Sequence, residues 1–264
     1  MDIIDFHAHI YPESIAAKAV ENVGKFYTLG MSGKGTACDL IECGKPVGIK
    51  KYVVHSPALH PKNVQSINNF IAEECSIHNE LIGFGTLHAF MDEPEKEVDR
   101  IISLGLKGIK LHPDSQQFDL DEPKMDSAYK YIEEMGLPVL FHTGDYRYSY
   151  SHPKRLVNVM EKCPDLTCIA AHFGGWSIFD LALEYLKDQN CFLDISSSMS
   201  FLGSVRSREL IEIYGADRIL FGSDFPMWTP GTELDKYLYL GFSEEVNKKI
   251  LYNNAIKILN SKNN

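Results

Sequence analysis

The sequence predicts a (β/α)8 barrel of the TIM type, in which eight parallel strands form an inner sheet surrounded by helices. Short apolar segments alternate with longer segments of helical periodicity along almost the whole chain, which is typical of parallel strands joined by helices. Eight such units in 264 residues fit one barrel. The rival fold, an open doubly wound sheet, needs a glycine-rich turn after its first strand, and this chain has histidines there instead.

The predicted strands are short apolar runs, several of which end on a histidine. Runs of this kind are expected where a parallel strand is covered on both faces. The eight predicted strands cover residues 3–8, 51–56, 82–88, 108–112, 138–142, 167–172, 192–196 and 218–223.

Helices are predicted between the strands wherever apolar residues recur at intervals of three or four. A last helix is predicted within 243–260, with Ser243 as its N-cap, because a serine hydroxyl accepts a hydrogen bond from the first turn. The clearest helical patterns are formed by Val64, Ile67, Phe70 and Ile71, by Val98, Ile101 and Ile102, and by Ile178, Leu181, Ala182 and Tyr185.

Residues 10–50 interrupt the alternation of strand and helix. A helix is predicted at 14–23, and a glycine-rich stretch follows at 30–35. That stretch lacks the Lys-Ser/Thr ending of a phosphate-binding loop, so we interpret it as a flexible flap or lid. The expected organisation is one domain over 1–264, with a lid-like insertion at about 10–50 and a C-terminal helix at about 243–260.

Composition narrows the partners to small molecules. The formal charge of -10 disfavours nucleic acids and anionic membranes, since both require a basic surface. We find no secretory signal and no apolar run of the roughly 18 residues that span a bilayer. The six cysteines have no C-x-x-C spacing, so free thiols are expected rather than a zinc knuckle or a disulfide framework. We therefore expect a cytoplasmic protein.

Histidines gather at the predicted carboxyl ends of the strands, which meet at one mouth of a barrel. Asp5, His7 and His9 alternate along the first strand and so share one face, where two imidazoles could bind one divalent ion. Asp224 follows the eighth strand. The histidines at strand ends are His7, His9, His55, His88, His112, His142 and His172.

Five motifs, found in order along the chain, resemble those of the amidohydrolase superfamily. The resemblance is strongest to its amidohydrolase-related branch, which includes hydrolases and nonoxidative decarboxylases of the aminocarboxymuconate-semialdehyde type, and it covers nearly the whole chain. The motifs are His7-x-His9, Phe141-His142-Thr143-Gly144, Ala171-His172-Phe173-Gly174-Gly175, Phe221-Gly222-Ser223-Asp224-Phe225-Pro226 and Asn254-Ala255.

The resemblance implies that His7, His9, His142 and Asp224 hold one divalent metal, usually zinc with manganese as the alternative, and that His172 contacts the water or the substrate. Three imidazoles and a carboxylate leave room for a water, whose pKa on zinc falls to about 7. Asp224 would accept the proton of this water and pass it to the leaving group. His172 would orient the water or stabilise the developing oxyanion.

Two residues near these ligands have alternative roles. In some decarboxylases of the branch an acidic residue placed like Asp5 joins the metal, whereas in many hydrolases it supports a metal-bound imidazole, which we expect here. Some superfamily members carbamylate a strand 4 lysine to bridge two metals. Lys110 is placed for this role, and the alternative is a cation that holds an anionic substrate.

Further residues at the mouth are candidates for binding the substrate. His55 and His112 would line the pocket or serve as structural histidines. Arg147 would clamp a substrate carboxylate in bidentate fashion, unless it pairs with Asp145. Aromatic and sulfur-containing side chains that would pack a ring or acyl group, or seal the barrel top, are Trp176, Phe225, Met227 and Trp228.

The sequence thus predicts metal-assisted hydrolysis of a small, carboxylated molecule. The first alternative is a lyase, in which His172 protonates a carbon as carbon dioxide leaves. A third hypothesis, from another class, is a barrel that binds a metal or ligand without catalysis. Members of this fold often dimerise, so a homodimer is an open option.

Overall fold

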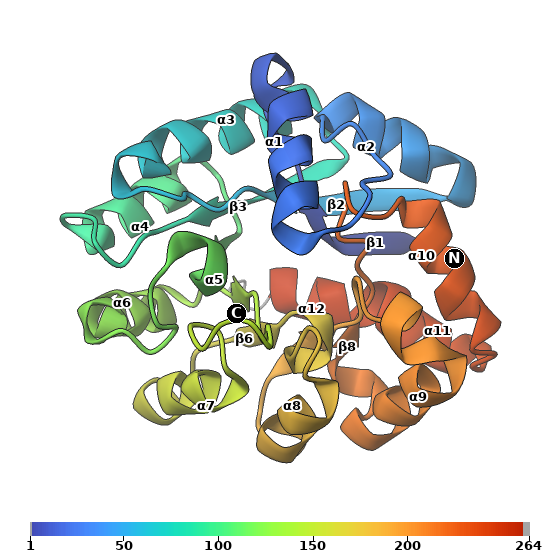
Figure 1. Cartoon of the computed structure of the whole chain (residues 1–264). Coiled ribbons are helices and arrows are strands. Elements are labelled where there is room, and N and C mark those ends of the chain that lie inside the picture. The colour runs from blue at the N-terminus through green and yellow to red at the C-terminus, as the bar shows by residue number, and fades with distance from the viewer. Residues whose placement is uncertain (1, 261–264) are drawn as a thin grey trace.

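The computed structural model describes residues 2–260, which form a barrel of eight parallel strands in the order β1 to β8. Helices alternate with the strands and surround them (Figure 1). The predicted fold class is therefore confirmed. The strands are β1 (Ile3–His9), β2 (Ile49–His55), β3 (Leu81–Thr86), β4 (Gly108–Leu111), β5 (Val139–Phe141), β6 (Cys168–Ala170), β7 (Phe192–Asp194) and β8 (Ile219–Leu220).

The barrel is closed between its first and last strands by backbone hydrogen bonds. Phe6 N donates to Phe221 O at 2.8 Å, and Asp224 N donates to His7 O at 2.8 Å. A parallel bridge joins Ala8 to Phe225 beyond the end of β8. Most strands end one to three residues earlier than the sequence predicts, because the chain leaves the ladder there and turns into the loops of the mouth.

The helices follow the strands as their periodicity predicts. Ser243 caps α11 through a hydrogen bond from Val246 N to its Oγ at 3.4 Å, and a π-helical turn at Lys249–Asn253 leads into α12. The helices are α1 (Glu13–Tyr27), α2 (Ala37–Gly44), α3 (Val64–Ile77), α4 (Pro94–Ser103), α5 (Pro113–Gln116), α6 (Asp126–Met135), α7 (Pro153–Lys162), α8 (Phe179–Leu186), α9 (Met199–Tyr214), α10 (Pro230–Tyr239), α11 (Glu244–Lys248) and α12 (Asn254–Leu259).

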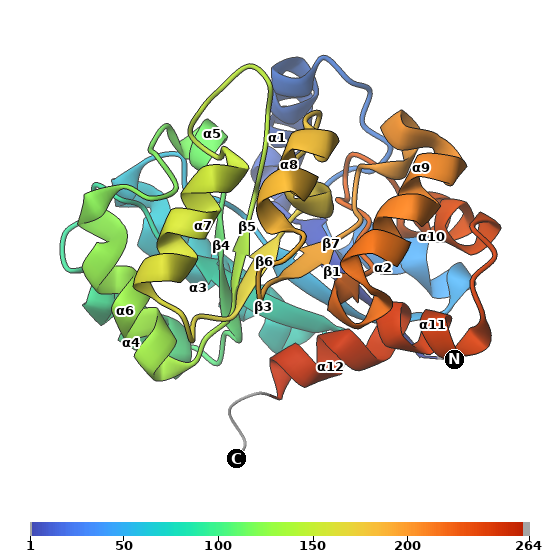
Figure 2. The same cartoon turned by 90° about the horizontal axis from the view of Figure 1, so that it is seen from below.

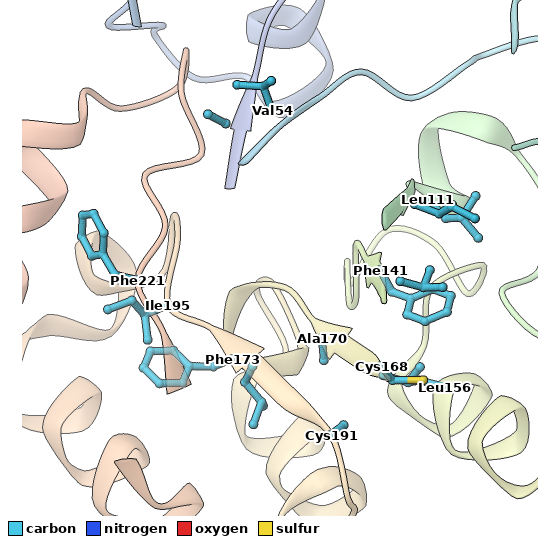
Figure 3. Packing of buried hydrophobic residues seen from close by; sticks show 14 of the residues in the cluster. Val54, Leu111, Phe141, Leu156, Cys168, Ala170, Phe173, Cys191, Ile195 and Phe221 are labelled. Carbon is cyan, nitrogen blue, oxygen red and sulfur yellow. The ribbon is translucent and has the colours of Figure 1, made fainter. Parts of the chain in front are cut away.

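Two apolar layers lie on opposite faces of the strands, because successive strand residues point in opposite directions. The larger layer joins strands to helices, and Figure 3 shows part of it, with Phe141 and Cys168 of the strands near Leu156 of α7. The second layer fills the barrel. It gathers residues from strands all round the sheet together with two from α12: Ile4, Phe6, Val53, Phe84, Leu140, Ile169, Leu220, Ala255 and Ile258.

The two ends of the barrel are covered by different helices. In Figure 2, α12 crosses one end and α1 lies at the other. Asn254 fastens α12, since its side-chain amide donates to Ala216 O at 2.8 Å and to Ile219 O at 2.7 Å. The α12 end is closed by apolar packing, so the end near α1 is the one that can open to a ligand.

The segment between β1 and β2 contains α1, α2 and a glycine-rich stretch that packs on the loop after β8. Ser32 N and Gly33 N both donate to Pro226 O at 2.9 Å. A side chain on Gly33 would overlap the ring of Phe225, so this close approach requires glycine. The predicted flap is thus held against the barrel, and its role as a lid stays a prediction. None of the helices within residues 2–260 combines the length and apolarity needed to cross a membrane.

Candidate active site

The mouth of the barrel beneath α1 brings the predicted site residues from six strands together. Three of the side chains there stand on left-handed backbone, with φ of 58° at His172, 53° at Ser197 and 57° at Asp224. Such conformations cost about 1–3 kcal/mol each for residues other than glycine. Close backbone packing supports the loops, because Gly144 after β5 touches Gly175 after β6 and a side chain at Gly144 would overlap it.

His7, His9 and Asp224 converge on one point. Nε2 of His7 lies 3.3 Å from Nε2 of His9, and Oδ1 of Asp224 lies 3.4 Å from each of these nitrogens. Ligands at the corners of a tetrahedral site with bonds of about 2.0–2.1 Å are separated by roughly these distances. The three atoms could therefore hold one divalent ion.

The protonation of His7 fits this role. Nδ1 of His7 lies 2.8 Å from Oδ2 of Asp194. Because a carboxylate can only accept a hydrogen bond, Nδ1 must carry the proton, and Nε2 therefore presents its lone pair to the site. Burial alone would raise the pKa of Asp194, but His7, His172 and the hydroxyl of Ser196 keep it below its usual value. Asp194 is therefore the ionised carboxylate that orients a candidate metal ligand.

His142 and His172 form a second pair of imidazoles beside the first. Nδ1 of His142 lies 3.1 Å from Nε2 of His172, and Nδ1 of His172 donates to Ser196 O at 2.9 Å. Nε2 of His142 has no hydrogen-bond partner within residues 2–260, and it lies 3.5 Å from Oδ2 of Asp114. If His142 carries its proton on Nε2 and directs it at Asp114, then Nδ1 of His142 and Nε2 of His172 both present lone pairs to each other across 3.1 Å. A cation or proton shared between these two nitrogens would stabilise the arrangement.

Burial keeps the candidate ligands neutral, as metal binding requires. It lowers the pKa of His7 to about 4, and it lowers the pKa of His9 and, more strongly, of His142. The pKa of Lys110 falls to about 8 for the same reason. A bound cation would favour the neutral amine of Lys110 further, so the donor set fits a divalent metal.

Asp5 does not touch an imidazole, contrary to our expectation. Its carboxylate accepts from Ser223 Oγ at 2.5 Å, from Ser223 N at 2.9 Å and from His7 N at 3.2 Å. The register of β1 against β2 shifts between Asp5 and Ala8, so the regular alternation from which a shared face was expected is interrupted there. Asp5 therefore ties the backbone of β1 to the loop after β8, and Asp194 holds the ring.

Lys110 and His55 are buried beside the candidate ligands and are not among the residues that line the cavity. Nζ of Lys110 is 3.2 Å from Nε2 of His7, and the side chain is fully buried. His55 is also fully buried, with its ring 4.4 Å from that of His9 and with both nitrogens unpartnered among the described residues. Their role in binding a substrate stays a prediction, and the cavity lining gives it no support.

Arg147 is held by protein groups, in the pairing with Asp145 that the sequence left open as the alternative to a carboxylate clamp. Its Nε and Nη2 donate to the carboxylate of Asp145, at 2.9 Å and 2.6 Å respectively, and Nη1 donates to Phe26 O at 2.5 Å. Trp176 is likewise buried, with its ring 5.0 Å from that of Tyr27. Both residues support α1 rather than line the cavity.

A cavity of about 850 Å³ opens above the candidate ligands. His112, as predicted, is among its lining residues; its ring stacks on that of His142 at 3.8 Å and its Nε2 lies 2.8 Å from the hydroxyl of Tyr27. The site residues that reach this cavity are His9, His112, Asp114, His142, His172 and Asp224.

Sequence reasoning missed four residues of the site: Asp194, Ser196, Asp114 and Tyr27. Asp194 and Ser196 alternate within the predicted seventh strand, the signal that singled out His7 and His9, but they carry no histidine. Asp114 follows His112 by two residues in the same way. Tyr27 lies beyond the predicted end of its helix, and nothing in the local sequence indicates that it reaches the barrel mouth.

Comparisons with known proteins show the family and agree with the fold. A family model described as amidohydrolase matches residues 4–260 and confirms the resemblance found in the sequence. An uncharacterised TIM-barrel protein from Bordetella bronchiseptica superposes with a TM-score of 0.79 at 21% identity, covering 100% of both chains.

Two similar structures carry the names of enzymes. A dihydroxybenzoic acid decarboxylase from a Polaromonas species, with bound manganese and the inhibitor 2-nitroresorcinol, has a TM-score of 0.76 at 17% identity, covering 98% of this chain and 96% of that one. A protein from Pseudomonas putida, provisionally named a 2-pyrone-4,6-dicarboxylic acid hydrolase, has a TM-score of 0.72 at 19% identity, covering 98% of each chain. At these identities the similarity establishes the fold.

Proposed function

The chain belongs to the amidohydrolase family, and from this premise we propose that it is a metal-dependent hydrolase that directs an activated water at a small molecule. The observation that carries the proposal is the convergence of His7, His9 and Asp224, whose ligand atoms lie 3.3–3.4 Å apart at the floor of a cavity. His142 would complete the ligand set through Nδ1. Zinc is the first candidate and manganese the alternative, since the similar decarboxylase has manganese bound.

A divalent ion in this position would supply a water acidic enough to lose its proton near neutral pH. Asp224 would accept that proton, because Oδ1 faces the site while Oδ2 is held by the hydroxyl of Ser197 at 2.6 Å. Trp228 in turn donates to Ser197 Oγ at 2.9 Å, which fixes the carboxylate. The same carboxyl group would then return the proton to the leaving group.

His172 would stabilise the negative charge that develops on the attacked group. Its Nδ1 is bound to Ser196 O, so the ring is fixed and Nε2 faces the site beside His142. A fixed imidazole in a partly dry cavity can donate a hydrogen bond to an oxyanion once it is protonated.

A nonoxidative decarboxylase is the second candidate, favoured by the likeness to the dihydroxybenzoic acid decarboxylase. The same residues would serve, with His172 giving a proton to carbon as carbon dioxide leaves. The cavity contains Phe26, Tyr27 and Tyr148, which suit a ring.

The first experiment measures the metal. Purified protein should contain about one divalent ion per chain, and a chelator should lower the melting temperature, because an ion that binds only the folded state stabilises it. Protein without a divalent ion, and with a melting temperature that a chelator leaves unaltered, would contradict the proposal.

The second experiment separates the reactions with a panel of carboxylated lactones, amides and aromatic acids. Incorporation of oxygen-18 from solvent water into the product supports hydrolysis, and release of carbon dioxide without it supports the lyase. Asp224→Asn should abolish turnover while the circular dichroism spectrum stays unchanged, and retained turnover would exclude the role of Asp224 in proton transfer.

We also propose that the protein works in the cytoplasm. All six cysteines are unpaired, as expected in a reducing compartment.

A further inference from the structure

The cavity extends well beyond the candidate metal ligands, into a groove lined by residues of α1 on one side and by residues of α3 and the segment that leads into it on the other. Its volume of about 850 Å³ is in the upper part of the range of roughly 300–1,000 Å³ for small-molecule sites. The polar residues that line the part of the groove far from the ligands are Asn22, His60, Asn63 and Ser66. The aliphatic and aromatic side chains that line this part are Ile15, Ala19, Val23, Leu59, Ile67 and Phe70.

Large apolar side chains stand exposed on both walls of this groove. Ile15 on α1 and Leu59 after β2 are each 52% exposed, and Val23 and Ile67 are partly exposed deeper in. Apolar surface gains free energy when it is covered, at about 25 cal/mol per Å². A ligand with an apolar body would cover these side chains from both sides.

The cavity also restricts the charge of its ligand. Among the described residues that line it there is no lysine and no arginine. Two cations beside the site are committed elsewhere, since Lys110 lies buried against His7 and Arg147 is bound to Asp145. Asp114 and Asp224 line the cavity and would repel a second anionic group.

We propose that the site takes molecules with a single anionic or oxygen-rich head and an extended apolar body, rather than di- or tricarboxylates. The head would lie at the metal, so this part rests on the proposed function. The body, an acyl chain or an equivalent apolar group, would lie in the groove between α1 and α3. The α1–α3 groove thereby selects substrates by length and by the absence of a second charge.

The test uses isothermal titration calorimetry of the metal-loaded protein with straight-chain monocarboxylates from acetate to decanoate. Affinity should rise about threefold with each added methylene until the chain fills the groove, since each buried methylene is worth roughly 0.8 kcal/mol at most. Octanedioate should bind at least tenfold more weakly than octanoate. A flat series, or tighter binding of the dicarboxylate, would overturn the proposal.

Substitutions in the groove test whether the apolar body of the ligand binds there. Ile15→Asn and Leu59→Asn change half-exposed side chains, so the fold should tolerate them, and each should reduce octanoate affinity several-fold while leaving acetate unchanged. The matched control is Ile77→Asn, which alters a 62% exposed isoleucine of α3 outside the groove and should leave the whole series unchanged. An equal loss in Ile77→Asn would show that binding is unspecific and would refute the groove.

Repeating the series on chelator-treated protein distinguishes the two proposals. If the protein binds no metal and its affinity for monocarboxylates still depends on their chain length, the groove proposal stands and the proposed catalytic function is contradicted. If the protein binds a metal and its affinity does not depend on chain length, the proposed function stands and the groove proposal is contradicted.

Discussion

At the scale of single residues, His7 is the most constrained side chain of the site. Its ring is held by Asp194 on one side, and its Cβ lies beside Gly222, where a side chain would come within 2.8 Å of it. Ser196 contributes by donating to Asp194 at 2.5 Å. The position of Nε2 therefore depends on a carboxylate and a glycine that make no contact with a substrate.

Asp194→Asn should lower the affinity for zinc about 10- to 100-fold, as is typical when the partner of a metal-bound histidine is altered. The substitution keeps the shape of the side chain but removes the charge that fixes the proton on Nδ1 of His7. Competition with a chromogenic chelator measures the affinity. Asp180→Asn, on the exposed surface of α8, is the control, and an unchanged affinity in Asp194→Asn would contradict the assigned role.

Glu233 gives a second residue-scale prediction, about stability. Burial raises the pKa of this carboxyl group from 4.5 to about 7, despite its hydrogen bond from Lys236. The folded state thus binds the proton more tightly than the unfolded state. The stabilisation that the protonated carboxyl group gives to the folded state is complete below pH 4.5 and is lost as the pH rises towards 7.

Glu233→Gln should remove that dependence. The free energy of unfolding of the variant, relative to the natural protein, should increase by about 2–3 kcal/mol between pH 4.5 and pH 8, because each pKa unit corresponds to about 1.4 kcal/mol. Urea denaturation at both pH values measures it. Glu244→Gln, at an exposed glutamate, should show no such increase, and a parallel pH dependence in both variants would argue against the raised pKa of Glu233.

At the scale of elements, α1 is attached to the barrel mouth by its last turn. The guanidinium of Arg147 binds Phe26 O and lies 4.8 Å and 5.5 Å from the ring centres of Phe26 and Tyr27. The Tyr27 hydroxyl then reaches His112. The same helix forms one wall of the α1–α3 groove, so access to the site depends on this attachment.

Arg147→Ala should loosen α1 without unfolding the barrel. Hydrogen exchange of the amides in Glu13–Tyr27 should become at least tenfold faster, since a charge-assisted hydrogen bond and the ring contacts are lost. Mass spectrometry of peptides from α1 and from α6 separates the local effect from a global one. Arg206→Ala removes surface ion pairs of α9 and serves as the control; equal exchange in both variants would exclude the attachment.

Strands and helices were predictable from the sequence because their signal is local. Periodicity identified the eight strands and the helix that becomes α1, but it ended this helix at residue 23, whereas the helix continues to Tyr27. The last turn is stabilised by Arg147, which is 121 residues away along the chain from Phe26, and no local pattern records such a contact.

The site was predictable only in part, for a similar reason. Residue type and strand position brought out His7, His9, His172 and Asp224, which the fold gathers at one mouth. The partners of each ring depend on side-chain directions, so Asp194 was missed, and Lys110, His55, Arg147 and Trp176 were assigned to a cavity whose lining does not include them.

At the scale of the whole molecule, the two ends of the barrel serve different purposes. The site and the cavity occupy the end at the carboxyl termini of the strands, while α12 and its apolar contacts close the other end (Figure 2). In barrels of this type, changes at the closed end affect stability rather than chemistry.

Asn254→Ala tests this separation. It leaves the carbonyl groups of Ala216 and Ile219 without their side-chain partner, which should cost about 1–3 kcal/mol of unfolding free energy. Zinc affinity should stay within twofold of the natural protein. A large loss of zinc affinity in the folded variant would show that the two ends are coupled.

The left-handed backbone at His172, Ser197 and Asp224 has a consequence for selection. Glycine adopts this conformation without strain, so replacing one of these residues by glycine relieves the backbone while it removes a functional side chain. A library sorted for thermal resistance alone would therefore enrich inactive proteins altered at these three positions. A sequence that keeps all three side chains therefore forgoes this relief of backbone strain in exchange for the functional groups.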